Sequence, residues 1–318
     1  MHSIDERKST VAILLATYNG ERYLPEQLES IARQTYSDWH LFVSDDGSTD
    51  ATMDAVDRFS GEHPGKVTVV PRGEKANGAC GNFLHLIAAC PSDYPYIAFC
   101  DQDDVWLEEK LAVSVSTINE LESQFSGPCL VFCDAEVSDS DLNMLAPSFF
   151  AFTGVDSSRT KLPELLVQNP ISGAGVVMNE TLLAKIQESA SHFTSEQIAM
   201  HDQWVGLIAA CFGNIAPINE PLYQYRQHGE NAMGAIPMSV GSVLGKAKIA
   251  QDSLRRKREQ ASVLLECYAP TLTPEKAELI KEFVELDAQP KGRRVLFCIR
   301  RGALMNGALR NAGLLFFI

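Results

Sequence analysis

The chain has 318 residues, of which 45% are hydrophobic and 21% are charged, with 21 glycines and 15 prolines. This balance excludes collagen, a coiled coil and a disordered chain, and the length allows one large domain or two ordinary ones. Lys and Arg number 27 against 41 Asp and Glu, so the formal net charge is −14. Such an acidic protein is a poor candidate for sequence-independent nucleic-acid binding, which needs many cationic contacts to phosphates.

The sequence carries no sign of export or of membrane insertion. Its first ten residues are charged and lack the apolar segment of a signal peptide, and no run of 18 apolar residues could form a spanning helix. The eight cysteines form no C-x-x-C pair, and five of them lie beside or within apolar runs, where a thiol packs as a small hydrophobe. We therefore expect a cytoplasmic protein with reduced cysteines.

The first hundred residues alternate short apolar runs with segments of helical periodicity. Residues 11–16 read VAILLA, a continuously apolar strand that is typical of a sheet covered on both faces. Leu24, Leu28 and Ile31 then repeat at helical spacing. Strand–helix alternation predicts right-handed crossovers and an α/β fold with a mostly parallel sheet. The strands expected here are residues 11–16, 39–44, 67–70 and 96–100, and the helices are 24–31, 51–59 and 83–89.

The second half is less regular. A helix with Leu107, Leu111, Val115 and Ile118 on one face precedes the next apolar run. We expect residues 1–235 to form one domain and residues 236–318 to form a helical, basic and amphipathic extension. The remaining elements expected in the domain are strands at 129–133, 172–177 and 222–225 and a helix at 204–212.

The end of the chain combines basic and apolar side chains. From residue 291 onward it has no acid, and it ends in LLFFI. A basic amphipathic element can lie in a membrane interface with its arginines at anionic headgroups, so we expect peripheral membrane contact here. A helix docked on the main domain is the alternative. The cations of this tail are Lys291, Arg293, Arg294, Arg300, Arg301 and Arg310.

Polar side chains follow three of the predicted strands. Residues 17–20 (TYNG), 45–48 (DDGS) and 101–104 (DQDD) each come directly after an apolar run. Because ligands of open parallel sheets bind beyond the carboxyl ends of the strands, we expect these turns to form one site.

The DQDD turn is the strongest of these signals. Three carboxylates in four residues repel one another unless a cation or solvent relieves the repulsion. Mg²⁺ and Mn²⁺ prefer oxygen ligands and commonly combine one or two carboxylates with substrate phosphates. The turn therefore suits a nucleoside-diphosphate ligand with Mg²⁺ or Mn²⁺, and a solvated acidic turn is the alternative. An aspartate of the DDGS turn could accept a hydrogen bond from a base N–H or a ribose hydroxyl, or the segment could simply form an Asx-type turn and cap the next helix.

Two blocks of sequence resemble a known family. The run ATYNGERYLPEQLESIARQTYSDWHLFVSDDGSTD and the later FCDQDDVW are similar to the inverting glycosyltransferases of family 2, which have the GT-A fold. HDQWVG and YRQHGENAMG resemble the branch that includes bacterial rhamnosyltransferases. The likeness covers about residues 9–235.

The resemblance implies a role for individual residues. Asp101 and Asp103 match a D-x-D motif, with Asp103 as the direct metal ligand, and His228 matches a position that can contact the metal. Asp202 matches the general base, although His201 stands where many members have an acid. The residues expected to contact the nucleotide sugar are Ala16, Thr17, Tyr18, Asn19, Asp46, Asp101, Gln102 and Asp104. Arg72 and Asn77 join this set because they follow the third predicted strand, and a surface turn is the alternative for them.

The function that the resemblance implies is metal-dependent inverting glycosyl transfer. The favoured donor is dTDP-L-rhamnose, with a UDP-hexose or a UDP-N-acetylhexosamine as the alternative. The acceptor would be a growing surface glycan or a polyprenyl-linked saccharide, which would place the protein on the cytoplasmic face of the bacterial inner membrane. Two other classes compete: a non-catalytic nucleotide-binding module, and a phosphatase of the haloacid-dehalogenase type. The phosphatase fits poorly, because that family carries its nucleophile on the first strand, whereas three predicted strands come before the one that leads into the DQDD loop here.

Overall fold

The structure is a computed structural model, and it describes residues 9–71, 78–229 and 243–318. The predicted domain boundary between residues 235 and 236 lies outside the described residues, as do Arg72 and Asn77. The domain division therefore stays a prediction.

The described strands form one sheet in the order β3-β2-β1-β4-β8-β6-β9-β5, with β7 beside β6. The strands from β3 to β4 are parallel to one another, as predicted. The other half departs from the predicted parallel sheet, because β8 runs antiparallel to both β4 and β6, while β9 is parallel to β6. The α/β class is confirmed, and the sheet is mixed. The strands are β1 (Val11–Thr17), β2 (Trp39–Asp45), β3 (Val67–Val69), β4 (Tyr96–Asp101), β5 (Val105–Trp106), β6 (Cys129–Ser138), β7 (Met144–Ala146), β8 (Val176–Asn179) and β9 (Asn214–Arg226).

Helices cover both faces of this sheet. Successive residues of β1 point to opposite faces, so Leu14 packs with the helices of one face and Ile13 with those of the other. Burial on both faces is the physical reason for the continuously apolar VAILLA run. One face carries α1 (Leu24–Ala32), α2 (Thr52–Glu62) and α4 (Lys110–Gln124), and the other carries α3 (Gly78–Ala89), α7 (Glu180–Gln187) and α8 (His201–Phe212). Two short helices, α5 (Phe149–Thr153) and α6 (Leu162–Leu165), lie between β7 and β8 in the chain.

Two predicted strands differ from the observed ones. The strand expected at 172–177 is a 3₁₀ turn, η1 (Gly173–Gly175), followed by β8. The strand expected at 222–225 is only the end of the 13-residue β9. Pro217 and Pro221 lie inside β9, near irregularities in its pairing with β6, and proline lacks the N–H that a regular ladder uses. The sequence pattern therefore concealed the first part of this strand.

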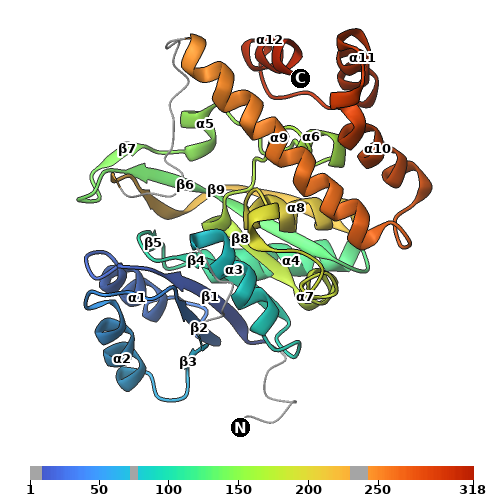
Figure 1. Cartoon of the computed structure of the whole chain (residues 1–318). Coiled ribbons are helices and arrows are strands. Elements are labelled where there is room, and N and C mark those ends of the chain that lie inside the picture. The colour runs from blue at the N-terminus through green and yellow to red at the C-terminus, as the bar shows by residue number, and fades with distance from the viewer. Residues whose placement is uncertain (1–8, 72–77, 230–242) are drawn as a thin grey trace.

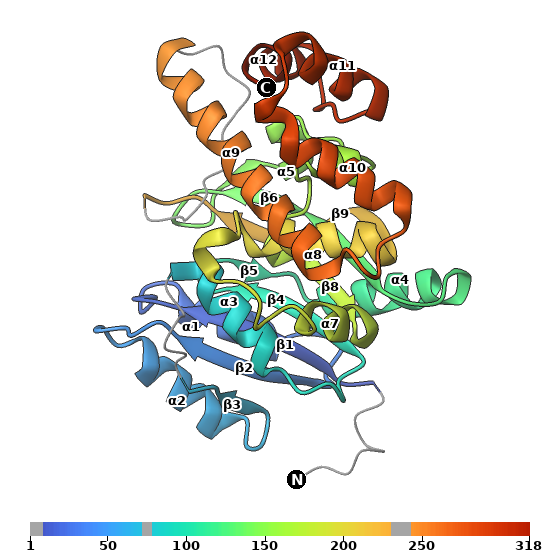
Figure 2. The same ribbon diagram turned by 45° about the vertical axis from the view of Figure 1, so that its right-hand side comes forward.

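The C-terminal extension is helical, as predicted. It consists of α9 (Val243–Tyr268), α10 (Pro274–Val284), a 3₁₀ turn η3 (Glu285–Ala288), α11 (Lys291–Arg301) and α12 (Ala308–Phe317). Figures 1 and 2 show it at the end of the molecule opposite the N-terminus. Its buried side chains, among them Leu264, Phe283 and Cys298, join the hydrophobic cluster of α8. In the described part of the chain, no helix has both the length and the apolar character that crossing a membrane requires.

Candidate active site

The carboxyl ends of β1, β2 and β4 bring the three predicted turns together. Thr17 pairs with Asp45 and Ala16 with Asp101 in the strand register. The polar residues that follow each strand therefore begin at the same level of the sheet edge. This is the arrangement that the sequence predicted for a single site.

The turn after β1 is tied directly to the DQDD turn. The backbone N–H of Tyr18 donates to Gln102 Oε1, and Gln102 Nε2 donates to the carbonyl of Tyr18, both at 2.9 Å. A side chain at Gly20 would collide with this amide, since an added Cβ would lie 2.3 Å from Gln102 Oε1. Asn19 accepts the N–H of Thr49 at 2.9 Å and so joins the same turn to the segment after β2.

The two aspartates of the DDGS turn have different tasks. Asp45 folds the turn, because its carboxylate accepts the N–H groups of Gly47 and Ser48 at 3.0 and 2.7 Å and the hydroxyl of Thr17 at 2.9 Å. The Asp46 carboxylate instead accepts the N–H of Gly78, at 2.7 Å, at the start of α3. Asp45 thus forms the Asx-type turn of the alternative interpretation, but it does not cap α2, whose N-cap residue is Ala51. Asp46 lies between β2 and the first turn of α3.

Asp202 comes to the same edge from the other half of the chain. It lies in the first turn of α8, and the backbone N–H groups of Gln203 and Gly173 donate to its carboxylate. Burial nevertheless raises the pKa of Asp202 to about 7. Burial also raises the pKa of Asp101 to about 7, with further contributions from the charges of Asp103 and Asp202. The carboxylates of Asp101 and Asp103 thus share one electrostatic environment with that of Asp202, which lies far away in the sequence.

His201 lies behind Asp202 in an apolar setting. Its ring is 5% exposed, stacks on Phe83 at a centroid distance of 4.0 Å and meets Phe99 edge-on. Neither ring nitrogen has a hydrogen-bond partner among the described residues, and burial lowers the pKa of His201 to about 3. The ring is therefore neutral, and it replaces an acid without supplying a charge.

His228 meets the DQDD turn. Its Nε2 lies 2.7 Å from Asp103 Oδ2, and its ring packs against Tyr23 at a centroid distance of 4.7 Å. Asp101 and Asp103 carry the carboxylate oxygens that Mg²⁺ and Mn²⁺ prefer, and the ring nitrogen of His228 lies beside the second of them. No group of three or more His, Cys, Asp and Glu side chains forms a ready-made metal site in the described ranges. The donor set still fits a divalent cation, because mutual repulsion contributes to the raised pKa of Asp101.

Asp104 differs from its two acidic neighbours. It is fully buried, and its Oδ1 accepts the backbone N–H of Arg226 at 3.2 Å. Burial, followed by the charges of Asp103 and Asp101, raises its pKa well above the ordinary value. This placement suits an anchor of the loop better than the donor contact that the sequence predicted.

Arg226 is the residue that sequence reasoning missed. It ends β9, is 2% exposed, and donates from Nε to the carbonyl of Asp103 and from Nη1 to the carbonyl of Ser140, both at 2.8 Å. Nη2 pairs with Glu26 of α1, and the guanidinium covers the ring of Tyr23 at 4.6 Å. Its position two residues before His228 was the one hint in the sequence that Arg226 lies near the site. Its partners could not be predicted, because they come from three distant segments of the chain.

The sequence was compared with protein families and with known proteins, and two of the matches identify the family. The profile of the family described as Glycosyl transferase family 2 matches residues 12–168. The chain is also 31% identical over 225 residues to the dTDP-rhamnosyl transferase RfbG of Shigella flexneri, covering 70% of this chain and 74% of that protein. The chain belongs to glycosyl transferase family 2.

Further relatives of this family 2 member differ in what their names say they act on. WfgD of Escherichia coli, a UDP-Glc:alpha-D-GlcNAc-diphosphoundecaprenol beta-1,3-glucosyltransferase, is 35% identical over 106 residues, covering 33% of this chain and 40% of WfgD. Among solved structures, TarS 1-349 of S. aureus in complex with UDP-GlcNAc matches with a TM-score of 0.54 and 15% identity, over 92% of this chain and 88% of that one. Likeness at this level of identity supports the fold alone, and the fold is GT-A, as expected.

Proposed function

We propose that this family 2 member is an inverting glycosyltransferase that moves L-rhamnose from dTDP-rhamnose to a hydroxyl group of a growing surface glycan or lipid-linked saccharide. The observation that carries the proposal is the meeting of Asp101, Asp103 and Asp202 at the carboxyl edge of the sheet. The likeness to the dTDP-rhamnosyl transferase supports the choice of donor.

The nucleotide end of the donor would lie at the edge of the sheet, beside the turns that follow β1 and β2. Ala16, Thr17, Tyr18 and Asn19 come from the first turn, and Asp46 comes from the second. Tyr18 is 56% exposed, so its ring is available to a base, while its backbone is held by Gln102. Gln102 thereby couples the nucleotide turn to the carboxylates that face the diphosphate.

The chemistry of transfer follows from the charges at this edge. Breaking the bond between the sugar and the diphosphate leaves negative charge on phosphate oxygens. Asp101, Asp103 and His228 would hold a divalent cation, whose chemistry when bound is to neutralise that charge. Asp202 removes the proton of the acceptor hydroxyl while that oxygen attacks the anomeric carbon from the face opposite the diphosphate, so the configuration inverts. With a pKa of about 7, Asp202 is a base of suitable strength near neutral pH.

A UDP-hexose donor is the second candidate, and the likeness to WfgD is the observation that favours it. We further propose that the acceptor is carried on a polyprenyl lipid and that the protein works on the cytoplasmic face of the membrane. The basic extension supports this placement.

The direct test is a thermal-shift panel of dTDP-rhamnose, UDP-sugars and GDP-sugars with and without Mn²⁺. A ligand that binds only the folded state raises the melting temperature by mass action. We expect dTDP-rhamnose to raise it more in the presence of Mn²⁺ than in its absence. A shift with UDP-sugars alone would overturn the donor assignment, and no shift with any donor would contradict nucleotide-sugar binding at this site.

The base is tested by Asp202→Asn in the same assay and in a transfer assay. The amide cannot accept the proton, so transfer should fall by about 100-fold or more. Donor and Mn²⁺ should still shift the melting temperature, because the diphosphate end of the site is unchanged. Transfer that stays within a few-fold of the unaltered protein would place the base elsewhere.

A further inference from the structure

The charges of the C-terminal tail are mostly used inside the fold. Four of its six cations bind backbone carbonyls or carboxylates of the protein itself. They are Lys291, Arg294, Arg301 and Arg310. The clearest case is Arg301, which forms a two-pronged ion pair with Glu282 of α10 at 2.7 and 2.9 Å. Lys291 joins α11 to α12, Arg301 joins α11 to α10, and Arg310 joins α12 to the carbonyls of Gly154 and Thr153. These four cations are therefore already paired within the protein.

Two cations remain outside this internal network. Arg300 is exposed and forms no ion pair with any described residue. Arg293 is also exposed, and its side chain makes one long contact with Gln289, at 3.4 Å. Both side chains are therefore free to meet an anion outside the protein.

The same side of α11 exposes large apolar side chains. Leu296 is 43% exposed and Ile299 is 58% exposed. At 100° per residue, these two side chains and the two free arginines fall within an arc of about 120°. We call this surface the α11 face, and its members are Arg293, Leu296, Ile299 and Arg300.

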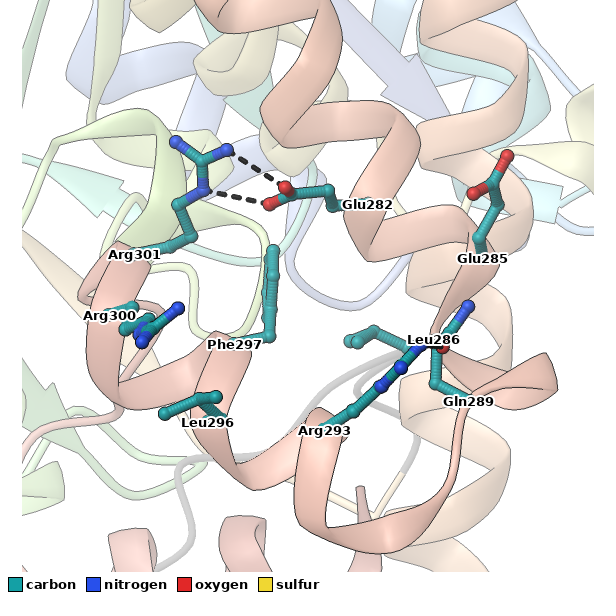
Figure 3. Close-up of a pocket in the computed structure, with 9 residues that line it drawn as sticks. All are labelled: Glu282, Glu285, Leu286, Gln289, Arg293, Leu296, Phe297, Arg300 and Arg301. Atoms are coloured by element: carbon teal, nitrogen blue, oxygen red, sulfur yellow. Dashed lines mark hydrogen bonds and ion pairs between the residues drawn. The ribbon is translucent and has the colours of Figure 1, made fainter.

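A groove of about 510 Å³ borders this face, between α11 and the segment formed by α10 and η3. Figure 3 shows Phe297 directed into the space between the helices and Arg301 joined to Glu282 across it. Leu286 and Phe297 make the groove partly apolar, while Arg293 and Arg300 lie along it. Two acids line the groove, and each has a cation beside it: Glu282 pairs with Arg301, and Glu285 lies 4.0 Å from Lys281. The remaining charges at the groove are the positive charges of Arg293 and Arg300.

We propose that the α11 face docks on an anionic lipid bilayer. Arg293 and Arg300 meet lipid phosphates, and Leu296 and Ile299 enter the boundary between headgroups and acyl chains. Charge selects this surface, because Arg293 and Arg300 are exposed cations on a chain whose net charge is −14. The acidic remainder of the protein is repelled by anionic lipid. This inference rests on the proposed function, because a lipid-carried acceptor is the reason for the enzyme to bind a membrane.

The exposed apolar pair on α12 is a rival surface at the same end of the molecule. Leu309 is 68% exposed and Phe316 is 75% exposed. Arg310 cannot assist them, because its guanidinium is bonded to the carbonyls of Gly154 and Thr153. The α11 face therefore has both the apolar and the cationic components, and the α12 surface has only the first.

The test is sedimentation of the full chain with phosphatidylglycerol vesicles, compared with phosphatidylcholine vesicles. Deleting the tail would be uninformative, because Cys298 and Leu314 belong to the core. We expect salt-sensitive binding to the anionic vesicles only. The double variants Leu296→Ser with Ile299→Ser, and Arg293→Gln with Arg300→Gln, should each weaken binding by about tenfold or more.

A matched control distinguishes binding by the α11 face from non-specific binding by exposed apolar side chains elsewhere. Met144→Ser with Leu145→Ser removes an apolar pair of similar exposure, 55% and 56%, on β7 and should leave vesicle binding unchanged. The proposal is overturned if the unaltered chain does not bind, if the α11 variants bind normally, or if only Leu309→Ser with Phe316→Ser abolishes binding. A dimer seen by gel filtration and lost in the α11 variants, without vesicle binding, would assign the face to a second copy. Donor-induced thermal shifts, measured without vesicles, report on the proposed function separately.

Discussion

Replacing Arg226 with Met should loosen the DQDD turn from the rest of the fold. The Arg226 guanidinium is almost fully buried and bonds the carbonyls of Asp103 and Ser140. Methionine fills a similar volume but leaves both carbonyls without their donor. Each unsatisfied buried group costs about 1–3 kcal/mol. Glu26 adds little, because its side chain is 54% exposed and can be hydrated once its partner is gone. The N–H that Asp104 accepts belongs to the backbone and survives the change.

The expected loss from the two carbonyls is therefore about 2–6 kcal/mol of the free energy of unfolding, measured by urea denaturation. A protein near the middle of the ordinary range of about 5–15 kcal/mol remains folded after such a loss. The Mn²⁺-dependent thermal shift with donor should shrink, because Asp103 is no longer held from its carbonyl side. Arg226→Lys should recover part of the stability, since one ammonium replaces only one prong of the fork.

Arg33→Met is the matched control. This arginine is 57% exposed and pairs with Glu29 on the surface of α1, so its loss should cost no more than about 1 kcal/mol. If Arg226→Met loses no more stability than this control, or if it responds to Mn²⁺ and donor as the unaltered protein does, then the network around Arg226 does not position the turn.

Three further predictions concern pH and the glycines. The transfer rate should rise with pH and reach half its maximum near pH 7, because Asp202 must lose its proton and its pKa is about 7; a flat pH–rate profile from pH 5.5 to 8.5 would contradict this. In the metal-free protein, Asp101 and Asp202 keep protons that the unfolded chain releases near its pKa of 3.8. The free energy of unfolding should therefore decrease as pH rises from about 4 to about 7, and an increase in urea midpoints over that window would refute the assignment. Gly20→Ala displaces only the flexible Gln102 side chain, so it should weaken donor binding at a stability cost of about 1 kcal/mol. Gly175→Ala meets the rigid carbonyl of Cys133, with an added Cβ 2.8 Å away, and should cost about 1–3 kcal/mol; equal thermal stability of the two variants would contradict the contrast.

Local pattern was sufficient to predict the first half of the fold. The strands β1, β2 and β4 are apolar runs buried on both faces, and the helices between them have apolar residues at helical spacing. The type of each element could therefore be predicted from its own residues. Parallel pairing of these strands then places TYNG, DDGS and DQDD at one edge. This is why the meeting of these polar turns at one edge could be predicted from the sequence, whereas nucleotide binding there stays a proposal.

Tertiary structure decided what depends on distant partners. No local pattern reveals that Arg226 reaches Glu26, 200 positions earlier, or that Asp202 raises the pKa of Asp101. The mixed half of the sheet was hidden because β9 contains prolines and because η1 interrupts the strand expected at 172–177. The sequence shows that the tail has six cations. Only the packed helices show that four of them bind carbonyls or carboxylates of the protein and that Arg293 and Arg300 remain exposed. Sequence fixes which groups are available, and burial and pairing across the fold determine which of them still carry an unbalanced charge.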